Sequence, residues 1–456
     1  MTSFDVIVIG AGPAGEVIAG RLGKAKLDVA LVERDLVGGE CSFYACIPSK
    51  ALLRPGQALA EARRVPGAAE AVTGTVDVGA TLKRRDEVIH ELDDSAQLPW
   101  LDNRGVTLVR GHARLDGDRR VRVGDELLEA RRAVVIATGS AAMLPPIAGL
   151  AEAAPWTNRE ATTATAVPAR LLVLGGGPVG CELSQAYRTL GAEVTLVERG
   201  ARLLEREEPF AGETVRDVLA GQGVDVRVGA EVVSAARDDA GVTLVLADGE
   251  QLHGDELLVA SGRRQHTGDL GLETIGIEGG GPIEVGDDLR VTGHDWLYVL
   301  GDANGRALLT HMGKYQARIA ADAILGVAHE LRSDGTVSPR ITFTEPHVAA
   351  VGYTLAGALD AGIDAFFVEG DMSATAGGSF VGRGVEGRVR LIVERGSDRV
   401  LGATIVAVDG GESLHAATIA VTTGLTMPQL WHAVPAFPSR SEFWLHLIEA
   451  WEDEVA

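Results

Sequence analysis

Two cysteines separated by four residues offer thiol chemistry near the start of the chain. Cys41 and Cys46 lie in the segment GGECSFYACIPSK, which runs from residue 38 to residue 50. In a regular helix, residues five apart have Cα atoms roughly 8 to 9 Å apart, whereas a disulfide tolerates at most about 7 Å. If Cys41 and Cys46 are bonded, the segment must therefore be a distorted helical turn, and Pro48 is consistent with such a distortion. The alternative is a pair of buried cysteines without a redox role.

A glycine-rich turn precedes these cysteines. Gly10, Gly12 and Gly15 follow the apolar run DVIVIG, and Glu33 ends the next apolar run. Glycines at this spacing let the backbone approach a pyrophosphate, the following helix N-terminus attracts its charge, and the acid accepts ribose hydroxyls. The arrangement of strand, turn, helix and acid therefore predicts a dinucleotide site. The structural alternative is an ordinary tight turn.

The same pattern recurs in the middle of the chain. Gly175, Gly177 and Gly180 follow LLVL, and Glu198 ends the strand expected at 194–197. Two such units predict two dinucleotides. A carboxylate at Glu198 favours NAD over NADP because it repels a 2′-phosphate, although Arg199 and Arg202 lie close enough in sequence to weaken that repulsion.

The cysteine segment resembles the GGTCxxxGCIPSK signature of the class I pyridine nucleotide-disulfide oxidoreductases, which include dihydrolipoamide dehydrogenase and glutathione reductase. The cysteine spacing and the CIPSK run match, whereas Glu40 replaces the usual Thr and Ala45 the usual Gly. The resemblance implies a redox disulfide, with Cys46 next to a flavin and Cys41 exchanging with substrate. It also implies that FAD binds the first glycine turn and NAD(H) the second.

Further segments carry residues with implied cofactor roles. Glu182 resembles the Glu of the family's GxEL run, which implies an ion pair with Lys50 beside the flavin. The structural alternative for Glu182 is an exposed helix residue. The segments ATGS, LYVLGD and LTHM resemble family segments near FAD, and SGRR resembles the one that leaves the nicotinamide domain. Together with the turn and Glu33, the implied FAD contacts are Arg34, Gly39, Lys50, Thr138, Gly139, Asp302, Thr310 and His311, and Gly262 is an implied NAD contact.

The C-terminal segment departs from the family. The family has HPTxxE, whose His is the acid–base for the thiols, whereas this chain has Phe437-Pro438-Ser439-Arg440-Ser441-Glu442. The alternative register puts Val434 in place of the His, so the His is absent either way. Glu442 is retained and is expected to take part in catalysis. His432 and Tyr44 are the remaining titratable candidates, and neither is a direct replacement.

The two functions that remain open differ in the electron acceptor. The first is an FAD-dependent NAD(P)H:disulfide oxidoreductase resembling dihydrolipoamide dehydrogenase, which acts on a small disulfide or dithiol. The second is a quinone-like acceptor reductase or transhydrogenase that works at the flavin, which Phe437 favours. Mercuric reductase and large thioredoxin reductase need a second pair of cysteines, and no cysteine follows Cys181, itself expected in the core. A non-catalytic flavin-bearing subunit is disfavoured by the intact cysteine pair and the second nucleotide site.

The resemblance implies an α/β fold with two Rossmann-type domains and a C-terminal α+β dimerisation domain. We expect residues 1–150 and 263–337 to form the FAD-binding domain, 151–262 the NAD(P)-binding domain and 338–456 the interface of a homodimer. Within these domains, we expect a helix to about Arg64, a charged helix near 82–98 and antiparallel strands over 106–136. We expect further antiparallel strands from Thr342 onward.

Composition limits the partners. The chain has 456 residues with a net charge of -22, which argues against nucleic acid or an anionic membrane. The first residues already read as a strand, and no apolar run approaches about 18 residues, so neither a signal peptide nor a membrane helix is expected. Three cysteines do not form a structural disulfide framework, which fits a cytoplasmic protein. No metal site is predicted.

Overall fold

The structure is a computed structural model that describes residues 2–456. The chain forms two compact units. Unit 1 contains residues 2–48, 85–143 and 262–335, and unit 2 contains residues 49–84, 144–261 and 336–456. Residues 49–84, which we expected in the FAD-binding domain, are therefore grouped with unit 2. The expected four-part division of the chain stays a prediction.

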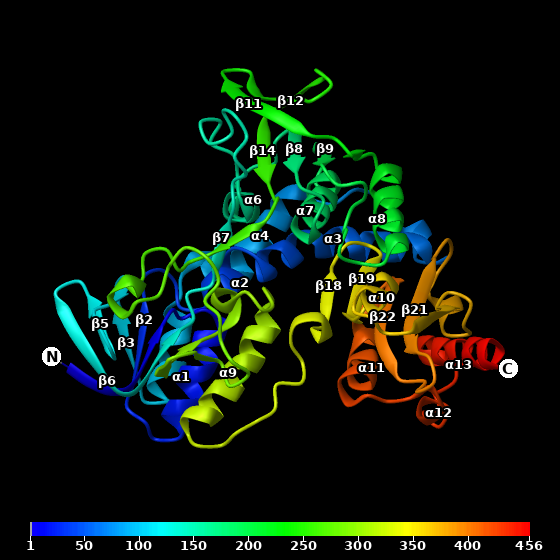
Figure 1. Ribbon diagram of the computed structural model, residues 1–456. Coiled ribbons are helices and arrows are strands. Elements are labelled where there is room, and N and C mark those ends of the chain that lie inside the picture. The colour runs from blue at the N-terminus through cyan, green and yellow to red at the C-terminus, as the bar shows by residue number, and fades with distance from the viewer. Residues whose placement is uncertain (1) are drawn as a thin grey trace. The chain divides into compact units, whose positions relative to one another are not determined.

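Unit 1 is built on a sheet whose central strands are parallel (Figure 1). The order is β16-β17-β6-β1-β2-β3, and the β4–β5 hairpin continues from β6. Its strands are β1 (Thr2–Ile9), β2 (Val29–Glu33), β3 (Val106–Arg110), β4 (Ala113–Leu115), β5 (Arg120–Val123), β6 (Glu126–Ile136), β16 (Arg290–Val291) and β17 (His294–Val299). A separate ribbon pairs β7 (Ser140–Ala142) with β15 (Arg263–Gln265). Residues 6–9 of β1 and 29–32 of β2 are continuous apolar runs because both faces of a parallel sheet are covered.

Helices α1 (Pro13–Lys24) and α9 (Thr310–Ile324) lie side by side in unit 1 (Figure 1). The remaining helices that lie in this unit, or begin in it, are α2 (Gly39–Phe43), α5 (Leu98–Asp102) and α3 (Cys46–Arg64), of which α3 continues into unit 2. The predicted end of α3 at Arg64 is confirmed.

Two local expectations are wrong, one for a helix that begins in unit 2 and ends in unit 1, and one for a strand of unit 1. The charged helix is α4 (Val78–Val88), which begins earlier than expected and ends ten residues sooner, because the chain turns into a left-handed conformation after Ile89. Strand β3, which we expected to be antiparallel, pairs parallel to β2. Within residues 106–136, only β4, β5 and the N-terminal half of β6 pair antiparallel.

Unit 2 contains a second parallel sheet in the order β10-β9-β8-β14. Its strands are β8 (Arg170–Leu174), β9 (Glu193–Glu198), β10 (Asp225–Val228) and β14 (Glu256–Val259). A separate antiparallel sheet consists of β11 (Val232–Asp238), β12 (Gly241–Leu246) and β13 (Gln251–Gly254). The helices are α6 (Asn158–Thr163), α7 (Pro178–Thr189) and α8 (Pro209–Gly221). The strand–turn–helix order of β8 and α7 repeats that of β1 and α1.

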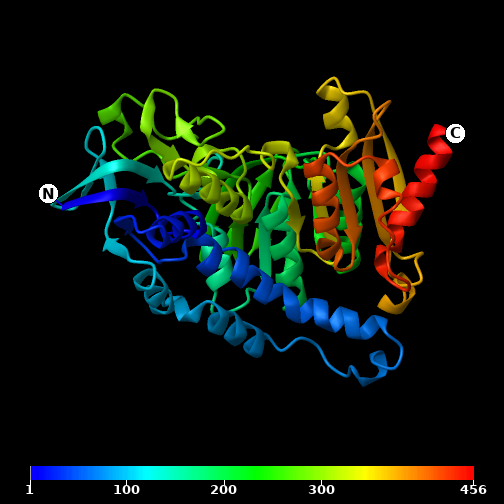
Figure 2. The same ribbon diagram turned by 90° about the horizontal axis from the view of Figure 1, so that it is seen from below.

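The C-terminal part of unit 2 is an antiparallel five-stranded sheet, ordered β18-β19-β22-β21-β20. The strands are β18 (Arg340–Thr342), β19 (His347–Gly352), β20 (Ala365–Asp371), β21 (Gly387–Glu394) and β22 (Val400–Ala407). The helices are α10 (Leu355–Asp360), α11 (Gly410–Thr423), α12 (Met427–Leu430) and α13 (Phe443–Val455). Helix α11 packs against β19 and β22, and α13 packs against β20 (Figure 2). The predicted α/β fold with two glycine-loop sheets and a C-terminal α+β part is confirmed.

Within residues 2–456, no helix combines the length and the apolar content needed to cross a membrane. In the same residues, no three His, Cys, Asp or Glu side chains are grouped so that they could hold a metal ion.

Candidate active site

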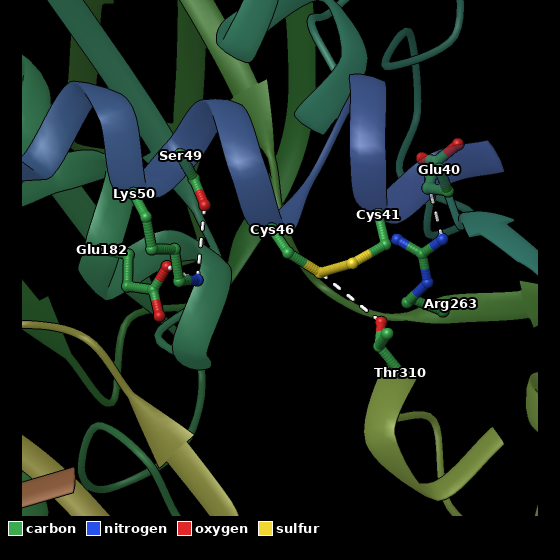
Figure 3. Close-up of a disulfide and its surroundings, with 8 residues drawn as sticks. All are labelled: Glu40, Cys41, Cys46, Ser49, Lys50, Glu182, Arg263 and Thr310. Carbon is green, nitrogen blue, oxygen red and sulfur yellow. Dashed lines mark hydrogen bonds and ion pairs between the residues drawn. A yellow bond between two sulfur atoms is a disulfide. The ribbon is translucent and has the colours of Figure 1, made fainter. Parts of the chain in front are cut away.

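The two cysteines are bonded at a break between two helices. Helix α2 ends at Phe43, Tyr44 has φ −131° and ψ −3°, and α3 begins at Cys46. The break brings the Cα atoms of Cys41 and Cys46 to 4.7 Å, and their sulfurs form a disulfide (Figure 3). The predicted distortion is therefore real, but Pro48 is not its cause. Pro48 lies in the first turn of α3, where its missing N–H removes no helical hydrogen bond.

The N-terminus of α9 faces the sulfur of Cys46. Thr310 is the first residue of this helix, and its Oγ1 lies 3.5 Å from Cys46 Sγ (Figure 3). A helix N-terminus carries partial positive charge, and a hydroxyl can donate to a thiolate, so both favour the ionised form of Cys46 after reduction. His311, the next residue, is exposed on α9.

A polar network joins the residue before Cys41 to the loop after β17. Arg263 Nη2 lies 3.8 Å from Glu40 Oε1, and Arg263 Nε donates to Ser140 Oγ at 2.7 Å. Ser140 in turn donates to Asp302 Oδ2 at 2.5 Å. Asp302, which we expected at the flavin ribityl chain, is thus held in place by β7. The segments ATGS and SGRR contain Ser140 and Arg263, but the sequence did not predict their contacts with Asp302 and Glu40, because these contacts join distant segments.

The first glycine turn leaves the N-terminus of α1 open. A Cβ on Gly10 would lie 2.5 Å from the carbonyl oxygen of Ala137, and Gly10 has φ +99°, so glycine is required there. A Cβ at Gly12 would meet nothing within 4 Å, and no side chain caps α1. The open amides and the helix dipole suit a pyrophosphate. Gly39 lies against this turn, since a Cβ added to it would be 2.8 Å from the Cα of Gly12.

Glu33 holds the turn together. Its carboxylate accepts the N–H of Ala11 at 2.6 Å and the N–H of Asp35 at 2.7 Å. A cavity of about 290 Å³ opens beside it. The predicted FAD residues that line this cavity are Gly10, Glu33, Arg34 and Thr138. The cavity is large enough for part of a dinucleotide and is lined by the residues that such a group needs, so FAD fits this unit.

Other cavity residues were not expected from the sequence. His112, Arg264, His266 and Asp269 also line it. His112 Nε2 lies 3.1 Å from Asp269 Oδ2, and burial, with the charges of Arg34 and Arg114, lowers the pKa of His112. Arg264 lies in the SGRR segment but was not predicted to contact FAD, and no motif marks the other three, which follow β3 or β15 and meet only in the folded unit.

The second glycine turn repeats this geometry in unit 2. Glu198 accepts the N–H of Gly176 at 2.6 Å and that of Gly200 at 2.6 Å, as Glu33 does in unit 1. A Cβ at Gly177 would meet nothing within 4 Å, and no side chain caps α7. A second dinucleotide therefore fits here. Arg199 is exposed, and Arg202 donates to the carbonyl of Glu205 at 3.0 Å.

The expected ion pair of Lys50 and Glu182 forms within unit 2. Lys50 Nζ lies 2.7 Å from Glu182 Oε2, and the Glu182 side chain is only 5% exposed (Figure 3). Glu182 Oε1 accepts the N–H of Phe343 at 2.8 Å, and Lys50 Nζ lies 4.6 Å from the centre of the Phe343 ring. Phe343, which the sequence did not single out, therefore holds both partners of the pair in place.

Comparison with known proteins decides the family. The chain matches the pyridine nucleotide-disulphide oxidoreductase model over residues 4–320 and the dimerisation domain of that family over residues 338–448. The chain belongs to the pyridine nucleotide-disulphide oxidoreductase family. It is therefore an FAD-dependent NAD(P)H:disulfide oxidoreductase, and the dimerisation domain supports a homodimer.

Similar proteins have several names. The chain is 34% identical to the mercuric reductase of Streptomyces lividans, covering 94% of this chain and 93% of that protein. It is 32% identical to the dihydrolipoyl dehydrogenase of Haloferax volcanii, covering 97% and 94%. The HOCl-induced flavoprotein disulfide reductase RclA from Escherichia coli has a TM-score of 0.85 at 26% identity, covering 98% and 99%.

Bound in this family's fold, FAD supplies two-electron transfer between a nicotinamide and a disulfide. The chain's own residues bind and orient the two dinucleotides, and Thr310 with the N-terminus of α9 favours a thiolate at Cys46. Gly139 (φ +72°) and Gly262 (φ +151°) adopt backbone conformations that favour glycine. Gly262 also accepts the N–H of Met143 at 3.0 Å, and its expected contact with NAD stays a prediction.

The C-terminal segment presents an apolar side chain where the family has an acid–base. Phe437 is 79% exposed. Glu442 Oε2 accepts the N–H of Ser439 at 3.1 Å and that of Gly377 at 3.2 Å, so this carboxylate caps the helical turn that leads into α13. His432 is exposed and contacts the ring of Trp431.

Proposed function

We propose that this enzyme uses NADH to reduce a small disulfide through Cys41 and Cys46. The observation that carries the proposal is the disulfide at the α2–α3 break, with Cys46 next to Thr310 and the N-terminus of α9. Cys46 becomes the thiolate next to the flavin, and Cys41 attacks the substrate disulfide. Lys50 is held by Glu182 and Phe343 in unit 2, and the resemblance to the family implies that it takes part in binding FAD. In each turnover, NADH gives up a hydride and becomes NAD⁺, one proton comes from solvent, and the substrate disulfide becomes two thiols.

NADH is the proposed donor because Glu198 places a carboxylate at the ribose of the second dinucleotide. Both of its oxygens already accept backbone N–H groups, so its negative charge is fixed at the turn. A 2′-phosphate would meet that charge, whereas ribose hydroxyls can still donate to it.

A second acceptor class, quinone-like molecules reduced at the flavin, is favoured by Phe437. An exposed phenyl ring replaces the group that moves protons to and from the thiols. It also suits a planar apolar acceptor better than a charged peptide disulfide.

Serine variants separate these functions. We expect Cys41→Ser and Cys46→Ser to abolish reduction of a disulfide such as lipoamide or 5,5′-dithiobis(2-nitrobenzoate), and to keep reduction of ferricyanide. The control is Cys181→Ser, because Cys181 is fully buried and burial raises the pKa of its thiol. Full disulfide reductase activity in both active-site variants would rule out the cysteine mechanism. If both variants still reduce quinones, the quinone takes its electrons from the flavin and not from the cysteines.

A further inference from the structure

A left-handed turn follows helix α4 in unit 1. His90, Glu91 and Leu92 have φ values of 51°, 53° and 63°, and none of them is glycine. The N–H of Leu92 donates to the carbonyl of Ile89, and the N–H of Asp93 donates to that of His90, at 3.0 and 2.9 Å. Consecutive non-glycine residues rarely adopt this conformation, and where they do, the surrounding structure holds them in it. Asp94, two residues after this turn, is buried.

Asp94 is a buried carboxylate with two partners. Its Oδ2 accepts the backbone N–H of Val37 at 2.7 Å and Nη2 of Arg110 at 2.6 Å. Val37 is fully buried, so water cannot replace the carboxylate at its N–H. Arg110, the last residue of β3, also donates Nη1 to the carbonyl of Asp35 at 2.6 Å. Asp94 and Arg110 therefore fix the chain at Asp35 and at Val37.

Residues 35–38, which are fixed in this way, connect the first glycine turn and Glu33 to the cysteines. Glu33, at its start, bonds to Ala11. Gly38, at its end, donates its N–H to the carbonyl of Ala11 at 2.8 Å and precedes α2, in which Cys41 is the third residue. The position and rigidity of α2, and hence of the Cys41 thiol opposite Cys46, depend on how firmly residues 35–38 are held.

We propose that Asp94 is a positioning residue for the redox disulfide. It touches neither substrate nor sulfur, and acts by holding Val37 and Arg110 so that Cys41 stays within bonding distance of Cys46. Preorganisation of this kind raises the effective concentration of one thiol at the other and so favours the disulfide over the dithiol. The inference rests on the redox role proposed above for the two cysteines.

The test is a thiol–disulfide titration of the purified flavoprotein. Wild type, Asp94→Ala and Asp94→Asn are equilibrated in buffers of reduced and oxidised dithiothreitol, quenched with a maleimide reagent and assayed for modified cysteines by mass. Asp94→Ala should need about 3- to 10-fold less reduced dithiothreitol for half-reduction, the factor expected for losing one or two buried hydrogen bonds. Asp94→Asn, which keeps an oxygen acceptor, should lie between Asp94→Ala and wild type.

Asp116→Asn is the matched control, because it removes an exposed Arg–Asp pair with Arg122 in the same unit. Its midpoint should equal that of wild type. FAD content and ferricyanide reduction should stay within about 2-fold of wild type in Asp116→Asn, as surface changes usually have small effects. The Asp94 variants should also keep both properties, because the proposal places the effect of Asp94 on the cysteine pair and not on the flavin.

Three outcomes overturn the inference. One is an unchanged midpoint in both Asp94 variants. Another is a parallel loss of FAD, ferricyanide reduction and thermal stability with no separate change in the midpoint, which would make Asp94 a general support of the fold. The third applies if Asp94→Ala does not fold. Arg110→Lys is then the test, because lysine keeps the charge but cannot bridge Asp94 and Asp35. An unchanged midpoint in Arg110→Lys would contradict the inference. If the wild-type pair itself cannot be reduced, the proposed function fails rather than this inference.

Discussion

At the scale of single residues, Phe437 is the substitution with the largest chemical consequence. A phenyl ring cannot accept or donate a proton, so thiol exchange at Cys41 depends on solvent or on another group such as Tyr44. Glu442 is still present, and only its Oε2 is used in the capping bonds described above. The carboxylate therefore retains an oxygen that can orient an imidazole placed nearby.

We predict that Phe437→His raises dithiol–disulfide turnover by about 10-fold or more, because a positioned acid–base typically contributes 10² to 10⁴ in rate. A new ionisation near neutral pH should appear in the kcat/KM profile for lipoamide. Val434→His is the matched control, since Val434 is equally exposed at 81% and lies three residues upstream. Equal activation by both variants, or wild-type turnover already typical of dihydrolipoamide dehydrogenases, would show that Phe437 is not the limiting residue.

A second prediction at this scale concerns the nicotinamide donor. We expect kcat/KM for NADH to exceed that for NADPH by about 10-fold or more, because Glu198 repels a 2′-phosphate. Arg199→Ala and Arg202→Ala should increase the ratio, since each removes a cation that attenuates the repulsion. Steady-state rates with both donors test this prediction. A ratio that favours NADPH would contradict it and would indicate that these arginines bind the 2′-phosphate.

At the scale of elements, the sequence predicted the features that depend on local sequence patterns. Both strand–glycine–helix units, the end of α3 at Arg64 and the break at the cysteines follow from motifs and spacing. The sequence did not predict the left-handed turn after Ile89, the parallel pairing of β3, or the roles of Phe343 and Asp94. These depend on contacts between residues far apart in the chain, and no residue in the HELDD segment is a glycine that would mark positive φ.

The packing of α1 against α9 leads to a prediction about pH. The pKa of Glu16 on α1 is raised from 4.5 to about 7, mainly because burial disfavours the charged form; the charge of Lys314 on α9 opposes this shift, and that of Glu33 adds to it. Because the folded-state pKa lies above the unfolded one, the protonated form stabilises the fold fully below about pH 4.5, and this contribution is lost as the pH rises through about 7.

Glu16→Gln should therefore raise the Tm at pH 8 and change it little at pH 5, because Gln resembles the protonated acid. Differential scanning calorimetry of the flavoprotein at both pH values measures this, with Glu126→Gln at the exposed start of β6 as control. An equal change at both pH values would mean that the Glu16 carboxylate is ionised throughout that range.

At the scale of the whole molecule, membership of the family supports a homodimer. We predict that light scattering after size-exclusion chromatography gives twice the chain mass of 47.7 kDa. Exposed apolar side chains near the C-terminus, Trp431, Val434 and Phe437, fit a surface that a second copy covers. A monomer at micromolar concentration with full disulfide reductase activity would contradict this prediction.

The redox role of Cys41 and Cys46 is tested most directly by an anaerobic titration with NADH, followed by visible spectroscopy. After two electrons per chain, wild type should develop a long-wavelength absorbance band from the Cys46 thiolate next to the flavin, while most of the flavin absorbance persists. Cys46→Ser should lose this band, and Cys181→Ser should keep it. Bleaching of the flavin at two electrons in wild type, with no long-wavelength band and no new thiols, would show that the disulfide does not accept electrons.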